Sequence, residues 1–103
     1  MSKERRLQLH EILVEKLGSR NVYFQPPSGH LMKYPCIVYQ RTETDVRYAN
    51  NQLYKDKDMY TATVIDSDPD SDIPARLKVL PYCRFNRRFT ADNLNHDVYN
   101  IYF

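Results

Sequence analysis

The sequence predicts an α+β fold: a mainly antiparallel sheet with an N-terminal helix and a second, short helix packed on one face. Leucines recur at helical spacing in residues 3–17, and five later segments are rich in β-branched and aromatic residues. A second helical pattern lies between the third and fourth of those segments. The expected order of elements is therefore α-β-β-β-α-β-β.

Length and composition indicate one folded domain that spans 1–103. The chain has 103 residues, of which 42% are hydrophobic and 27% charged, the balance of an ordinary globular protein. A core of this size leaves little room for a large internal pocket, which disfavours an enzyme with a buried cofactor. Nine tyrosines and two glycines predict much amphipathic surface and few hinges, which suits contact with other proteins.

The N-terminal helix is predicted over residues 3–17. Leu9, Leu13 and Leu17 fall on one face at helical spacing, with Ile12 beside them. Gly18 follows at the position where helices commonly end in a left-handed residue.

Two strands and a polar segment come next. A short strand at 21–24 stops before two prolines, residues 25–32 form a loop, and 34–40 is an apolar run typical of a strand central in a sheet. The polar segment 41–58 is expected to be a long hairpin arm or loop, and its Tyr48 and Tyr54 flank a predicted turn.

Residues 59–65 alternate like an antiparallel strand, and the acidic run at 66–72 breaks it. Ser71 or Asp72 caps a second helix that reaches to Leu80, before Pro81. Two final strands are predicted at 85–89 and 98–103, joined through 90–95. An exposed edge is a concern because the chain ends in an aromatic strand, and a neighbouring subunit is one way to cover such an edge, but the sequence leaves open which strands are the edges.

The acidic run resembles the start of a calcium loop, with carboxylates at every second position, namely Asp66, Asp68, Asp70 and Asp72. Such a loop requires glycine at its sixth position and glutamate at its twelfth, where this chain has Ser71 and Leu77. The run therefore indicates a solvated turn whose charges favour the start of the following helix, and no metal is expected.

A basic cluster of Arg84, Arg87 and Arg88 follows on a predicted strand. Strict alternation would place Arg84 and Arg88 on one face with Asn86, and Arg87 on the other face between Phe85 and Phe89. This arrangement is no stacking platform for bases. It leaves three alternatives: a solvated face, contact with phosphates, or pairing with acidic residues of another subunit.

No catalytic site or cofactor is predicted. His96 and Asp97 form the one close acid–base pair, but no nucleophile is marked near them, and His96 is interpreted as a hydrogen-bonded turn residue. Cys36 and Cys83 have no metal-ligand spacing and are expected to be reduced thiols.

Charge and hydropathy give two further expectations. The net charge of +2 hides an acidic run and a basic cluster, which could meet between neighbouring copies in a ring or within one subunit. No apolar run approaches the ~20 residues that cross a membrane, and the N-terminus lacks an apolar signal core, so an unprocessed cytosolic product is expected.

The ordered set of segments 23–27, 34–39, 60–71 and 93–97, together with the N-terminal helix, resembles the small tail terminator, or tail completion, proteins of long-tailed bacteriophages and prophages. The resemblance spans nearly the whole chain. It implies an α+β domain that assembles as a homo-oligomeric, commonly hexameric, ring on the end of the tail tube. Such a ring ends tube growth and presents a surface for head–tail joining.

The resemblance implies a structural virion protein rather than an enzyme, without a cofactor. Its expected partners are further copies of itself, the tail tube protein and a head connector or head-closure protein, with non-specific contact with packaged DNA and none with membranes. The location would be the head–tail junction of the virion, and the host cytoplasm during assembly. Subunit contacts are inferred physically for a set of acidic, basic and tyrosine side chains: Asp66, Asp68, Asp70, Asp72, Arg84, Arg87, Arg88, Tyr48 and Tyr54.

Two other functions remain as alternatives. A head-closure or connector component of the same virion has a similar size and also forms a ring. A small DNA-binding module that uses Arg84, Arg87 and Arg88 is the alternative from a different class.

Overall fold

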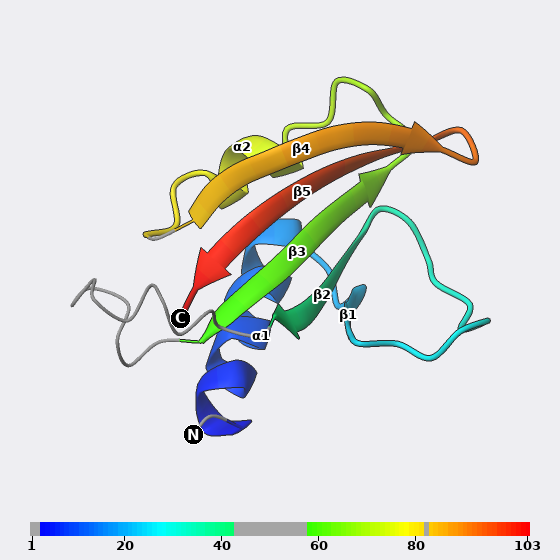
Figure 1. Cartoon of the computed structure of the whole chain (residues 1–103). Coiled ribbons are helices and arrows are strands. Elements are labelled where there is room, and N and C mark those ends of the chain that lie inside the picture. Colours follow the sequence, from blue (N-terminus) through cyan, green and yellow to red (C-terminus); the bar gives the residue numbers. More distant parts are fainter. Residues whose placement is uncertain (1–2, 43–57, 82) are drawn as a thin grey trace.

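The computed structural model describes residues 3–42, 58–81 and 83–103, and it confirms the predicted α+β class and order of elements (Figure 1). Tyr48, Tyr54 and most of the expected 41–58 arm lie outside the described residues. The elements are α1 (Lys3–Leu17), β1 (Val22–Phe24), β2 (Cys36–Thr42), β3 (Met59–Asp66), α2 (Ile73–Leu77), β4 (Cys83–Ala91) and β5 (Leu94–Tyr102).

The five strands form one sheet in the order β1-β2-β3-β5-β4. β1 runs parallel to β2, and every other neighbouring pair is antiparallel. The last strand is not an edge, because β5 lies between β3 and β4. β1 and β4 are the edges of the sheet instead.

A tight turn explains why β5 is interior. Asp92 and Asn93 both have left-handed backbone angles, with φ of 53° and 62°, which is the geometry of a two-residue hairpin. The two strands are therefore longer than predicted and are joined by two residues rather than by the segment 90–95. β5 then pairs along its whole length with β3, which leaves β4 outermost.

Both helices lie on the same face of the sheet and bury the core against it, behind the strands in Figure 1. Leu9 and Leu13 of α1 are 1% and 0% exposed, as their spacing predicts. Gly18 ends the helix with φ of +87°, and its N–H donates to the carbonyl of Val14 at 2.8 Å.

The second helix is shorter than predicted. It ends at Leu77, whereas the sequence favoured a helix to Leu80; Leu80 still packs against the core and donates its N–H to the Leu77 carbonyl at 3.0 Å. Asp72 holds the N-cap position but its side chain makes no capping hydrogen bond, and the hydroxyl of the preceding Ser71 accepts from the N–H of Ile73 at 3.2 Å instead.

Three fully buried tyrosines combine apolar packing with a polar contact. The hydroxyl of Tyr39 lies 2.8 Å from His10 Nδ1, that of Tyr60 accepts from an arginine of β2 at 3.2 Å, and that of Tyr99 donates to a carbonyl of α2 at 3.4 Å. Burial raises the pKa of Tyr99 to about 12 and lowers that of His10. The tyrosine-rich composition therefore serves the core as well as the surface.

Candidate interaction surface around the edge strand

Strand β4 presents the most extensive candidate surface. It is a nine-residue edge strand in which every residue between its two ends is exposed. Phe85 and Phe89 remain 53% and 39% exposed, although large aromatic side chains are usually covered. An exposed edge with apolar side chains is a surface on which another chain can pair.

A β-bulge at Asn86 sets which way the side chains of β4 point. Phe85 pairs with Tyr99 and Arg87 with Val98, so Asn86 is an extra residue without a pairing position in the ladder with β5, although its Nδ2 donates to Asn100 Oδ1 at 3.4 Å. Residues after the bulge therefore point to the face opposite to the one that strict alternation predicts.

The predicted grouping of the basic cluster is wrong for this reason. Arg88 pairs with Asp97 and shares the helix-covered face with Phe85, whereas Arg84 and Arg87 lie on the helix-free face. Asparagine is uncommon in strands, but this signal alone does not place a bulge, because a bulge is defined by the pairing with β5.

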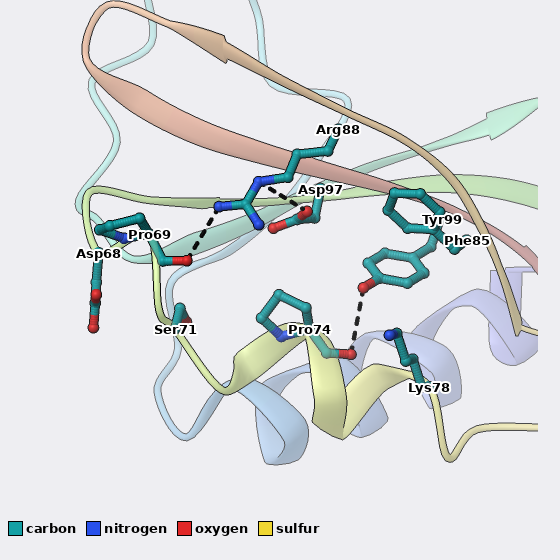
Figure 2. Close-up of a pocket in the computed structure, with 9 residues that line it drawn as sticks. All are labelled: Asp68, Pro69, Ser71, Pro74, Lys78, Phe85, Arg88, Asp97 and Tyr99. Atoms are coloured by element: carbon teal, nitrogen blue, oxygen red, sulfur yellow. Dashed lines mark hydrogen bonds and ion pairs between the residues drawn. The ribbon is translucent and has the colours of Figure 1, made fainter.

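Arg88 is held within its own chain. Its Nε lies 3.6 Å from Asp97 Oδ1, and its Nη2 donates to the Pro69 carbonyl at 3.2 Å (Figure 2). The side chain of Asp97 is only 11% exposed, so this carboxylate depends on the arginine for its charge partner. Arg88 thereby ties the edge strand to the acidic run.

The acidic run folds on itself more than the sequence suggests. Asp66 and Asp68 each accept, through Oδ1, the N–H two residues further along, at 3.0 and 2.9 Å. Asp72 pairs with Arg76 at 3.2 Å. Within the described ranges, Asp70 is the member of the run whose carboxylate makes no hydrogen bond or ion pair.

A cavity of about 250 Å³ lies between the acidic run, α2 and the edge strand (Figure 2). Within it, Arg88 points toward Asp97 and Pro69, and the rings of Phe85 and Tyr99 pack edge to face at 5.6 Å. Its wall consists of charged, polar and apolar side chains: Asp68, Pro69, Ser71, Pro74, Lys78, Phe85, Arg88, Asp97 and Tyr99. The structure thus unites Arg88 with the acidic run and separates both from Arg84 and Arg87.

His96 lies in β5 and not in a turn, which corrects its predicted location. Its Nδ1 is 3.1 Å from the Leu94 carbonyl oxygen, and its ring stacks on Phe89 at 4.5 Å. As neighbours on a strand, His96 and Asp97 point to opposite faces, so they do not form an acid–base pair.

The two cysteines are free and distant from each other. Three strand spacings separate β2 from β4, about 14 Å at ~4.8 Å each, which is beyond the reach of a disulfide. Burial raises the pKa of Cys36 to about 12 and that of Cys83 to about 11, so neither thiol is activated.

The described part of the chain has neither a metal-binding cluster nor a membrane-spanning helix. Residues 3–42, 58–81 and 83–103 contain no group of three or more His, Cys, Asp or Glu side chains that could hold a metal ion. Neither helix in these ranges is long and apolar enough to cross a membrane.

The fold and surface define an α+β domain with a basic, aromatic edge strand. No protein family matches the chain, and no curated protein or solved structure does so either.

Proposed function

We propose that this protein is a structural component of a phage or prophage virion that caps the tail tube as a homo-oligomeric ring. The ring ends tube growth and offers a surface for head–tail joining, without catalysis. The resemblance of the ordered segments suggests this role, and the exposed edge strand β4 is the structural observation that supports it most directly.

The edge strand supports assembly because its outer backbone groups have no strand partner within the described part of the chain. Such an edge is stable when another chain pairs with it or covers it, and a closed ring covers the same edge on every copy. The exposed ring of Phe85 adds apolar area beside the edge. Contact between copies through β4 would therefore bury both backbone and aromatic surface.

The ion pairs modify the proposed subunit contact. Arg88 is occupied by Asp97 and Pro69, and Asp72 by Arg76, so these side chains have partners before any copies meet. Asp70 remains available for contact with a partner. The proposed contact therefore depends mainly on the β4 edge and less on pairing between the acidic run and the basic cluster.

The test is assembly in the presence of tail tubes, followed by native mass spectrometry and electron microscopy. Phe85→Lys places a charge beside the edge and should abolish the ring. Leu7→Lys is the matched control, because Leu7 is 45% exposed on α1 compared with 53% for Phe85, and it should leave the ring intact. A wild-type protein that never associates with tubes or heads would refute the proposal, and normal rings from Phe85→Lys would refute the role of β4.

A head-closure or connector component of the same virion would use the same edge. Gene order distinguishes the two roles, because a terminator gene usually lies immediately before the gene of the major tail tube protein. Binding to isolated tubes but not to connectors would likewise favour the terminator role.

A further inference from the structure

The face of the sheet opposite α1 and α2, which we call the open face, is not covered by a helix in the described part of the chain. Its side chains alternate along each strand with those that pack under α1 and α2, and it faces the viewer in Figure 1. Its members come from all five strands and include Tyr23, Gln40, Thr61, Thr63, Arg84, Arg87 and Phe89.

The open face is cationic. Arg84 and Arg87 are exposed, and none of its described members is an aspartate or glutamate. The acidic strand residues Asp66 and Asp97, by contrast, belong to the helix-covered face. Among the described strand residues, the formal charges of the open face are therefore only positive.

The bulge at Asn86 creates this concentration. Arg84 and Arg87 are three positions apart, so in a regular strand they would point to opposite faces. With the extra residue, they pair with Asn100 and Val98, which are two positions apart on β5 and point the same way. The two backbone positions are then about 7 Å apart, close to two nucleotide rises of about 3.4 Å along one DNA strand.

The face also has a hollow of mixed polar and apolar lining beside Arg87. A cavity of about 180 Å³ lies beside Arg87 and Phe89, with Gln40, Thr61 and Thr63 among the side chains that line it. Amide and hydroxyl groups of this kind can bond to sugar and base edges without requiring a charge.

Arg87 is oriented by its neighbours. Its guanidinium carbon lies 5.1 Å from the centre of the Phe89 ring, and that ring stacks on His96 with an interplanar angle of 14°. Since Phe89 is already engaged with both side chains, the arrangement favours contact with phosphate over stacking of a base on Phe89.

We propose that the open face binds the phosphates of a nucleic acid strand through Arg84 and Arg87. The hollow lined by Gln40, Thr61 and Thr63 would then lie beneath the bound nucleic acid strand. Charge complementarity selects this partner, because the face offers cations and neutral hydrogen-bonding groups. The inference assigns nucleic-acid contact to one face and two named arginines, excludes Arg88 from it, and does not depend on the proposed tail function. In a ring, each added copy would add two phosphate contacts.

The experiment measures the fluorescence anisotropy of labelled single-stranded and duplex oligonucleotides across a range of salt concentrations. Two phosphate contacts per protein predict a slope of log affinity against log salt of about −1.4 for single strands and about −1.8 for duplexes. Arg84→Gln with Arg87→Gln should lower the affinity on the order of tenfold at low salt and bring the slope close to zero.

The control variant, Lys16→Gln with Arg20→Gln, removes the same charge from the helix layer. Lys16 lies in the last turn of α1, and Arg20 pairs with Glu11 of that helix. This variant should retain the wild-type slope, and circular dichroism would verify that both double variants are folded. An equal loss of affinity in the two variants would overturn the proposal, as would affinity that does not change with salt.

A protein partner would give a different result. Arg84 and Arg87 could instead pair with the acidic run of a second copy. In that case the Arg84→Gln, Arg87→Gln variant would sediment differently from wild type in the absence of nucleic acid. Wild type would also not bind oligonucleotides, and this result would overturn the proposal. The proposed tail function is tested separately. A protein that forms rings but does not bind nucleic acid would refute only the nucleic-acid proposal. A protein that binds nucleic acid but never associates with tail tubes would refute only the tail function.

Discussion

Replacing Arg88 by glutamine should destabilise the protein, although the residue lies on an exposed edge strand. The substitution removes the charge partner of Asp97, whose side chain is 11% exposed, and the hydrogen bond to the Pro69 carbonyl. An uncompensated carboxylate would then remain in a nearly buried position. Arg88→Gln therefore tests whether this arginine is committed within its own chain.

The expected size follows from the geometry. A hydrogen bond to a charged group contributes about 1.5–3 kcal/mol. The Arg88 side chain is 46% exposed and its Nε lies 3.6 Å from the carboxylate, so solvent screening favours the lower end, about 1.5 kcal/mol. With a urea m-value of about 1–1.5 kcal/mol/M for a small domain, the unfolding midpoint should fall by roughly 1 M.

The assay is urea unfolding followed by circular dichroism and tyrosine fluorescence. Arg84→Gln is the matched control: it removes the same charge from the same strand, where no ion pair is seen in the described residues, and should change the free energy of unfolding by less than about 0.5 kcal/mol. In an Asp97→Asn background, Arg88→Gln should lower the free energy of unfolding by less than it does in the wild-type chain, because the carboxylate charge of Asp97 is absent. Equal urea unfolding midpoints for Arg88→Gln and Arg84→Gln would show that Arg88 does not stabilise its own chain. Arg88 would then be available for contact between subunits.

Three further predictions concern the core, the helix end and the thiols. Leu13→Ala, at a side chain that is 0% exposed, should lower the free energy of unfolding by about 2–5 kcal/mol, and a loss below 1 kcal/mol in chemical denaturation would show that α1 packs loosely. Gly18→Ala should cost about 1 kcal/mol in the same assay because φ is +87°, and an unchanged or higher stability would contradict a left-handed helix end. Burial raises the pKa of the Cys36 thiol to about 12 and that of the Cys83 thiol to about 11, from the ordinary 9.0. The two buried thiols therefore contribute their full stability below pH 9.0, and this stability is lost as the pH rises toward 11 and 12. Urea unfolding at a series of alkaline pH values measures this loss, and fast thiol modification of the folded protein at neutral pH would contradict it.

The sequence predicts the elements of this fold well because their signals are local. The leucine spacing of 3–17 and Gly18 define α1 without reference to any other part of the chain. The alternation of 59–65 likewise predicts that Tyr60, Ala62 and Val64 share a face, and all three are buried. Such patterns report how a segment presents its own side chains.

The sequence fails where the answer depends on pairing between segments. Nothing local shows that Asn86 lacks a pairing position in the ladder with β5, yet that one residue moves Arg87 and Arg88 to the opposite faces from those predicted. The position of β5 inside the sheet depends in the same way on its pairing with β3. The candidate surface is therefore predicted in its residue types but not in its geometry.

The interior position of β5 has a consequence for how the chain is synthesised. The ribosome produces β1 to β4 before Leu94–Tyr102, the strand that joins β4 to the rest of the sheet. Until those residues emerge, β3 pairs only with β2, and β4 has no strand beside it. The core also lacks Tyr99 and Ile101. A nascent chain halted before residue 94 should therefore remain a client of chaperones and proteases, because the sheet cannot close before β5 has emerged.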